Sequence, residues 1–417
     1  MEATAARAPA PPAFQPPPGN PRFPLIDGLR AIAALSIVAF HAGHLTGSDL
    51  TWWGAYVSRL DVGVTIFFVV SGFLLYRPFV AARLEGRPRP GIPQYAARRA
   101  LRIVPAYWVA ITLLAVYPGI SGIFTGDWWI YYGLLQTYFG EHVLGGIQVA
   151  WTLVVEVSFY AVLPLLALAL TLPAAGRTRA GRLRAELALL ALLFAIPWTL
   201  RIVTAAEGDT PKRIVHLALS GSLDWFAWGM ALAVASVALH GRERSVAAIR
   251  LVHDHAWICW AAAAAMLVVM VELLDFRYAQ LEPTDWLWHH LLYGLLAVAL
   301  VLPAVFGTAG QGVVRRILGH PVAAWLGLVS YGIFLYHLPV VGELAGGAVG
   351  EWAGRYGFPV VLGLAAPIAI ALGAASYYAV ERPFLRLKPG VRVNGPRRAD
   401  RAPGPDPAPA GAPPRQG

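Results

Sequence analysis

Apolar residues along the chain fall into runs of about 20, separated by short stretches rich in arginine, proline and glycine. A helix of about 20 apolar residues crosses the hydrocarbon core of a bilayer. The pattern therefore predicts an all-α polytopic membrane protein with about ten transmembrane helices. The predicted spans are residues 25–46, 62–83, 100–118, 150–172, 186–204, 214–239, 254–274, 286–306, 321–342 and 356–381.

The stretch 126–148 is the ambiguous part of this pattern. It contains the aromatic run 128–132, and its apolar portion is only about 14 residues long, which is typical of a re-entrant or interfacial segment. If it crossed the membrane, the arginine-rich loop 177–184 would lie outside, against the positive-inside rule. We therefore predict that it does not cross, and that both termini are cytoplasmic.

Composition supports a membrane protein. Of the 417 residues, 57% are hydrophobic and 13% charged, whereas soluble domains average about 25% charged residues. The net charge of +10 does not indicate a nucleic-acid partner, because the arginines cluster in short loops between apolar runs. The single cysteine, Cys259, permits no internal disulfide and no cysteine-based metal cluster.

The two ends of the chain lack a packing pattern. Residues 1–24 are rich in proline and alanine, and we expect a disordered arm. They have no apolar core of a signal peptide, so the first span should act as an uncleaved insertion signal. Residues 389–417 should form a disordered tail, which leaves one transmembrane domain at 25–388.

Arg30 and His41 lie within the first apolar run. A charged residue in lipid costs on the order of 2.5–3.5 kcal/mol by insertion scales, and such residues usually face a polar interior. Eleven helical positions bring the two side chains to within roughly 20° around the axis and about 16 Å apart along it. Arg30 could instead snorkel to the interface, and His41 could be an interfacial histidine bonded to a carbonyl.

Other polar residues sit in or near the predicted spans. Arg99 and Arg102 share a helix face at the start of the third span, where they could bind phosphates or simply reflect positive-inside charge. Glu156 lies in an apolar run and needs a partner, most simply an arginine or histidine of another span. His337 precedes a proline and could be either a site residue or a hydrogen-bonded structural histidine.

Taken in order, these residues resemble the membrane-bound acyltransferase-3 family in its stand-alone form, without a fused extracytoplasmic hydrolase-like domain. Each motif alone is weak, but their order across the spans is specific. The matching residues are Asp27-Gly28-Leu29-Arg30 with His41, Phe67-Phe68-Val69-Val70-Ser71-Gly72-Phe73, Arg99-Ala100-Leu101-Arg102 leading to Pro105-Ala106-Tyr107-Trp108, Trp151-Thr152-Leu153 with Glu156, Ser330-Tyr331 with His337-Leu338-Pro339, and Glu381-Arg382-Pro383.

The resemblance implies an integral-membrane O-acyltransferase of the bacterial cytoplasmic membrane. It would move an acyl group, acetyl by default, from cytoplasmic acyl-CoA to a hydroxyl of a glycan, glycolipid or secondary metabolite. Arg99 and Arg102 would hold the donor's phosphates, with Arg30 deeper in the membrane. His41 would act as general base. Glu156 would either pair with Arg30 or position the acceptor.

The sequence departs from the family at one position. Members often carry a carboxylate two residues before the Phe-Phe pair, where this chain has Thr65. Asp61, one helical turn earlier, is then the alternative partner for the histidine, or the histidine has none. Ser71 is a possible oxyanion stabiliser, and His337 a possible supporting residue.

Two other classes of function remain open from sequence. A transporter or flippase of an acyl or glycan carrier could use Arg30 and His41 as a translocation path, although we see no inverted repeat. A sensor or scaffold would retain the fold with a degenerate site. No metal is expected, because the histidines at 253–255 and 289–290 lie near span ends and suit the interface. Neither alternative should consume acyl-CoA.

Overall fold

The computed structural model describes residues 23–48, 51–171, 176–207, 217–274, 283–308 and 310–387. Within these ranges, nine helices are long and apolar enough to cross a membrane, counting α12 together with the π-helical turn Val269–Leu273 that continues it. The all-α polytopic prediction is confirmed. The α-helices of these nine spans are α1 Leu25–Leu45, α3 Val62–Leu84, α4 Ile92–Val116, α6 Trp151–Ala169, α8 Arg179–Ala206, α12 Ala256–Val268, α13 Pro283–Val305, α15 Pro321–Gly346 and α17 Gly357–Ser376.

The predicted span at 214–239 appears as a shorter helix, α10, at Leu223–Ala238. Its 16 residues rise only about 24 Å, less than the thickness of a bilayer core. It nevertheless packs along α3, α8 and α13, and much of its surface is buried among them. Neighbouring helices, rather than lipid, cover most of its apolar surface.

The stretch 126–148 contains no membrane-length helix. It folds as the five-residue α5, Trp128–Tyr132, followed by short 3-10 turns that lead into α6. This agrees with the prediction that it does not cross the membrane. The remaining short helices are α2 Gly54–Val57, α11 Ala247–Asp254, α14 Gly312–Leu318, α16 Ala348–Ala353 and α18 Arg382–Arg386.

α4 begins eight residues before the predicted start at residue 100, at Ile92. Pro93 stands in its first turn, where the missing N–H costs nothing and the fixed φ suits the helix. Arg99 and Arg102 are therefore held on a rigid helix. Hydropathy alone had placed the boundary at residue 100, between the two arginines, because charged residues interrupt an apolar run.

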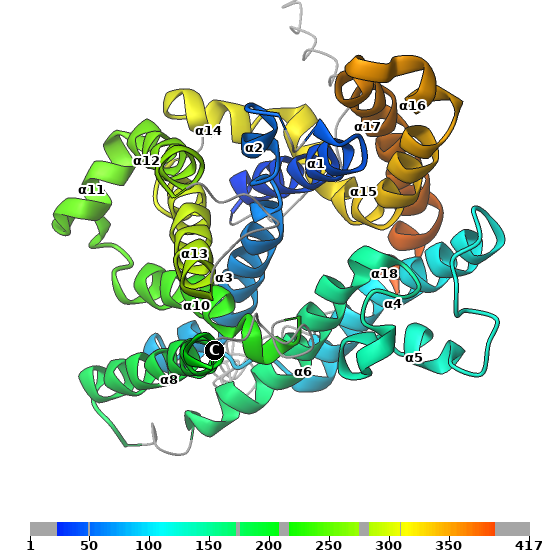
Figure 1. Ribbon diagram of the computed structural model, residues 1–417. Coiled ribbons are helices and arrows are strands. Elements are labelled where there is room, and N and C mark those ends of the chain that lie inside the picture. The colour runs from blue at the N-terminus through cyan, green and yellow to red at the C-terminus, as the bar shows by residue number, and fades with distance from the viewer. Residues whose placement is uncertain are drawn as a thin grey trace, which may run out of the picture.

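The helices around the polar interior pack closely against one another. α1 packs along α15 and α3, with α17 beyond α15, and α10, α12 and α13 lie on the other side of α3 (Figure 1). A Cβ on Gly327 would lie 1.9 Å from the carbonyl oxygen of Asp27, and one on Gly229 would lie 1.9 Å from that of Val69. Small residues at such crossings let backbones approach, which fixes α15 on α1 and α10 on α3.

Arginine-rich segments gather at one end of the bundle, as alternating helix directions require for the connections after α3, α6, α10 and α13. There Arg83 forms a buried 2.6 Å ion pair with Glu186, and Arg182 donates to the carbonyl of Arg83. By the positive-inside rule this end is cytoplasmic, which stays a prediction. The predicted tail, and all of the predicted arm except residues 23 and 24, lie outside the described residues.

The sequence suggested that His289 and His290 lie at the membrane interface, and the structure shows that they do not. They are 8% and 3% exposed. His290 Nε2 lies 2.7 Å from the carboxylate of Asp224, and its ring stacks on Trp225 at 4.3 Å. The reason is that α13 starts beside the start of the short helix α10, so residues near both ends face each other inside the bundle.

Candidate active site

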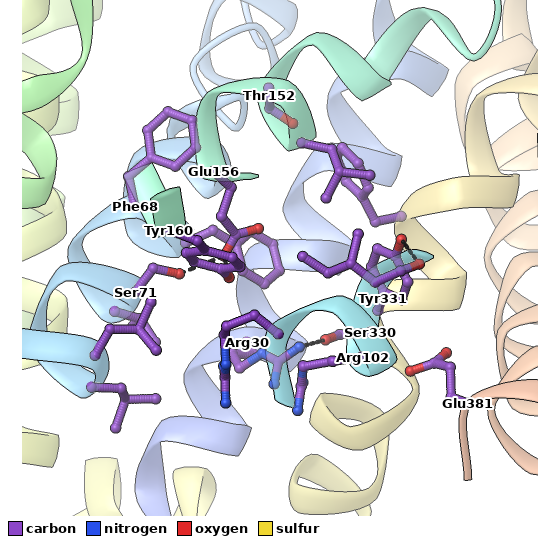
Figure 2. A pocket seen from close by; sticks show the side chains of 18 of the residues that line it. Arg30, Phe68, Ser71, Arg102, Thr152, Glu156, Tyr160, Ser330, Tyr331 and Glu381 are labelled. Atoms are coloured by element: carbon purple, nitrogen blue, oxygen red, sulfur yellow. Dashed lines mark hydrogen bonds between the residues drawn. The ribbon is translucent and has the colours of Figure 1, made fainter. Parts of the chain in front are cut away.

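A polar cavity of about 580 Å³ lies among the long helices. Its walls come from α1, α3, α4, α6, α15 and the π-helical turn Tyr377–Glu381 that follows α17 (Figure 2). Segments from both ends of the sequence therefore meet at one site. Its polar lining residues include Asp27, Arg30, Ser71, Arg98, Arg99, Arg102, Thr152, Glu156, Tyr160, Ser330, Tyr331 and Glu381.

Four arginines line this cavity, which places the predicted cationic residues together. Arg98, Arg99 and Arg102 come from the first turns of α4, and Arg30 comes from α1. Arg30 Nη2 donates to Ser330 Oγ at 3.1 Å, and the guanidinium of Arg99 lies 5.9 Å from the Tyr160 ring centre. Arg30 therefore faces the protein interior rather than snorkelling to the interface.

Among the described residues, hydroxyl groups bond Glu156, and not the arginine or histidine that the sequence suggested. Its Oε1 accepts a hydrogen bond from Ser71 at 2.6 Å and another from Tyr160. Figure 2 shows this group above the Arg30–Ser330 contact. Two hydroxyl donors satisfy the carboxylate where we expected a cation. The Ser71 hydrogen points at Glu156, so in this arrangement Ser71 does not serve as an oxyanion donor.

Glu381 is a cavity residue that the sequence analysis read only as part of a motif. It is 1% exposed, and one of its carboxylate oxygens, Oε1, has no hydrogen-bond partner among the described residues. It ends the π-helical turn, an irregularity that is frequent at functional sites. A carboxylate at the end of an apolar span is a sign in the sequence that Glu381 could be a site residue. Helical periodicity does not show whether it faces the protein interior.

His41 is not among the residues that line the cavity. It lies on α1 about 16 Å along the axis from Arg30. There it meets His337 of α15, with His337 Nε2 and His41 Nδ1 3.2 Å apart. Phe334, one turn before His337, does line the cavity. The histidine pair thus lies about one helical turn beyond the cavity wall, on the side away from the α4 arginines.

The hydrogen bonds of this pair determine which nitrogens carry protons. His337 Nδ1 lies 2.7 Å from the carbonyl oxygen of Phe334, and a carbonyl only accepts, so Nδ1 donates. In a neutral ring, Nε2 is then an acceptor and faces His41 Nδ1. His41 Nδ1 also lies 3.0 Å from the carbonyl oxygen of Ile37, so it too donates. The proton-accepting nitrogen of His41 is therefore Nε2.

Asp61 is not the partner of His41. Its carboxylate accepts a hydrogen bond from the hydroxyl of Tyr293 on α13. Thr65, at the position that is often acidic in the resembled family, is 1% exposed. The start of α3 packs against α13, where Asp61 meets Tyr293, whereas the neighbour that reaches His41 belongs to α15.

The arrangement combines three chemical elements along α1. Cationic side chains that can bind phosphate lie at one end, a half-buried carboxylate bonded to two hydroxyls lines the cavity, and an imidazole with an accepting nitrogen lies beyond it. Such a set can bind an anionic ligand and remove a proton from a hydroxyl. The residues that the sequence selected for these tasks come from four helices, α1, α4, α6 and α15.

Comparison with known proteins agrees with this chemistry. The chain is 24% identical to a peptidoglycan O-acetyltransferase of Listeria monocytogenes over 76% of its own length and 49% of that protein. It is 24% identical to a Bacillus subtilis protein provisionally named a peptidoglycan O-acetyltransferase, over 87% of its length and 54% of the relative. A Staphylococcus aureus protein provisionally named an O-acetyltransferase is 22% identical over 89% and 58%.

The chain spans about half the length of the curated relatives that it matches. No solved structure matches it. The model of the acyltransferase-3 family, described as an acyltransferase domain, matches residues 23–378, which include the five long helices that line the cavity and end just before Glu381. The chain therefore belongs to the acyltransferase-3 family of membrane proteins.

Proposed function

We propose that this protein is a membrane O-acetyltransferase that moves an acetyl group from cytoplasmic acetyl-CoA to a hydroxyl of a cell-envelope glycan. One observation supports the proposal most strongly. Along α1, a cavity lined by four arginines is followed by His41, whose hydrogen bonds fix Nε2 as its accepting nitrogen. Family membership supports acyl transfer. The relatives named as peptidoglycan O-acetyltransferases favour an envelope glycan as acceptor.

The donor's phosphates would bind the arginines of α4. Guanidinium groups suit phosphate because they donate paired, charge-assisted hydrogen bonds. Arg30, deeper in the bundle and anchored by Ser330, would hold the polar part of the donor next to the phosphates. The long pantetheine arm would then carry the thioester along α1 toward His41.

His41 Nε2 would take the proton from the acceptor hydroxyl as its oxygen attacks the thioester carbonyl. The new bond is an ester C–O bond, the bond that breaks is the C–S bond, and CoA leaves as the thiol. His41 would return its proton to the departing sulfur. His337 would act as a positioning residue, because it holds His41 Nδ1–H and so keeps the lone pair on Nε2.

The test is acetyl-CoA consumption by the full chain in nanodiscs, with peptidoglycan fragments as acceptor and the product ester measured by mass spectrometry. We expect His41→Ala to lower kcat by about 10²- to 10⁴-fold, the usual contribution of a general base. His44→Ala is the matched control, a histidine on the same helix that lies outside the cavity. Unchanged kcat in His41→Ala would remove the general-base assignment.

A second arm tests the donor site separately. Arg99→Gln with Arg102→Gln should raise KM for acetyl-CoA by about tenfold or more, since charge-assisted hydrogen bonds to phosphate are lost. Arg89→Gln is its control, an exposed arginine just before α4 that does not line the cavity. Wild-type protein that neither binds nor consumes acetyl-CoA would favour a transporter instead.

A further inference from the structure

A second cavity, of about 780 Å³, opens at the arginine-rich end of the bundle. It lies where α3, α10 and α13 finish, and it shares no lining residue with the first cavity. Nothing in the proposed acetyl transfer uses it. Its charged lining residues are Arg77, Arg87, Arg242, Arg244 and Glu243, together with His240 and His253.

The charges that line this cavity are not balanced. Arg87 forms a 2.5 Å ion pair with Glu85, which lies outside the lining. Apart from that pair, the described lining residues carry three arginines, Arg77, Arg242 and Arg244, and one carboxylate, Glu243. Outside the lining, Asp254 is close enough to Arg244 to interact with it electrostatically. Glu243 is already engaged within its loop, because its Oε1 accepts from the Gly241 backbone N–H at 3.0 Å and lies 3.6 Å from His240 Nδ1. The cavity therefore favours an anion.

Arg77 is held in the wall of the cavity from two sides. Its Nε donates to Ser236 Oγ at 3.0 Å, and Ser236 in turn donates to the carbonyl of Ala233, which ties α3 to α10. Its guanidinium carbon lies 5.1 Å from the ring centre of Phe23. A preorganised guanidinium loses less rotamer freedom when it binds a phosphate.

Part of the remaining wall is apolar. Phe23, Ile249, Val305 and Phe306 line it beside the arginines, and of these Phe23 and Ile249 are half-buried. A soluble phosphate would leave Phe23 and Ile249 uncovered, whereas a phospholipid would place its headgroup on the arginines and its glycerol and first acyl carbons on these side chains. Basic pockets between membrane helices on the cytoplasmic side bind anionic headgroups in this way.

We propose that this second cavity binds the phosphate headgroup of an anionic phospholipid from the leaflet at the arginine-rich end. The site is independent of the acetyl-transfer proposal. Its ligand class is a phosphate diester on a lipid, recognised by Arg77, Arg242 and Arg244 and by the apolar wall.

The experiment measures lipid binding to the full detergent-solubilised chain by native mass spectrometry, titrated with phosphatidylglycerol or phosphatidylcholine. We expect phosphatidylglycerol to be retained and phosphatidylcholine to be lost. Arg242→Gln with Arg244→Gln should weaken phosphatidylglycerol binding about tenfold. Both residues lie in the exposed loop after α10, so the variant should melt like wild type without lipid.

The matched control is Arg184→Gln with Arg316→Gln. These exposed arginines lie at the same end of the bundle but outside the cavity, and the change in net charge is identical. Equal weakening in both double variants, or none in either, would overturn the proposal in favour of diffuse surface attraction. Competition by inorganic phosphate, or by adenosine 3′,5′-bisphosphate, as effective as by lipid would assign the cavity to a soluble phosphate and overturn the lipid assignment.

Discussion

Two histidine contacts between helices of this protein look alike at first and leave different ring nitrogens available. His290 meets the carboxylate of Asp224 at 2.7 Å and stacks on Trp225, and neither partner of the pair lines either cavity. His41 meets His337 at 3.2 Å, next to the cavity residue Phe334. In the first pair Nε2 is occupied by the carboxylate. In the second, the bonds leave His41 Nε2 as an acceptor.

The comparison separates burial from reactivity. A short hydrogen bond to a buried histidine satisfies the ring and joins two helices, which is sufficient for α10 and α13. A general base needs in addition an unengaged lone pair beside a space that a substrate can enter. The close packing of α1 and α15 brings one histidine from each to about one helical turn beyond the cavity wall, where the hydrogen bonds leave His41 Nε2 as the accepting nitrogen.

Of the substitutions that test the difference between the two histidine pairs, we expect those at His337 to have the largest effect on kcat. His337→Phe keeps a ring in the α15 site but removes one of the two acceptors of His41 Nδ1–H and leaves the Ile37 carbonyl, so kcat should fall by about 10²-fold, within the usual range for a general base. KM for acetyl-CoA should stay unchanged. His337→Gln retains an acceptor atom and should recover part of the rate.

Steady-state kinetics with both substrates separates kcat from KM, and thermal melting in detergent shows whether either variant is misfolded. Equal loss of kcat in the Phe and Gln variants at an unchanged melting temperature would mean that His337 does not act through its acceptor nitrogen.

A smaller effect, on stability alone, is expected at the other pair. Asp224→Ala leaves His290 Nε2 without its partner inside the bundle, which should cost about 1–3 kcal/mol. The melting temperature should fall while kcat per folded molecule stays at the wild-type value. A variant of normal stability with greatly reduced kcat would instead make this second pair part of the reaction.

The smallest effect is expected at Asp61. The carboxylate bonds to Tyr293 on α13 and not to His41, so Asp61→Asn, which retains an acceptor oxygen, should leave kcat unchanged. Kinetics and melting on the same preparation provide the measurement. A large drop in kcat would show that Asp61 reaches the histidine in the working enzyme and that the His41–His337 contact is not the only support.

Sequence reasoning predicted most of the fold because the bilayer sets the length of each apolar run. It also selected Arg30, Arg99, Arg102 and Glu156, since charged residues in apolar surroundings are rare, and the structure brings all four into one cavity. It did not predict their partners. The contact of Ser71 with Glu156 depends on the packing of α3 against α6, which the sequence does not show, whereas Tyr160 stands four residues after Glu156 on α6, a spacing that brings side chains together on a helix.

The errors have a common cause. The start of α4 was placed too late, and His290 was placed at the interface, because hydropathy treats polar residues as ends of spans. His41 and His337 are 296 positions apart, and no periodic pattern links residues at that separation. Which residues meet across a bundle depends on helix rotation and close crossings such as that at Gly327, which local patterns do not contain.

The π-helical turn at Tyr377–Glu381 also determines what insertions and deletions the end of the domain can tolerate. A π turn accommodates one more residue than an α-helical turn, so deleting a residue there would restore a regular helix and rotate the residues after the deletion by about 100° around the axis. Glu381 would then turn away from the cavity, although every side chain of the motif would still be present. Variation in length between residues 377 and 380 should thus be as damaging to the proposed activity as replacing the glutamate itself.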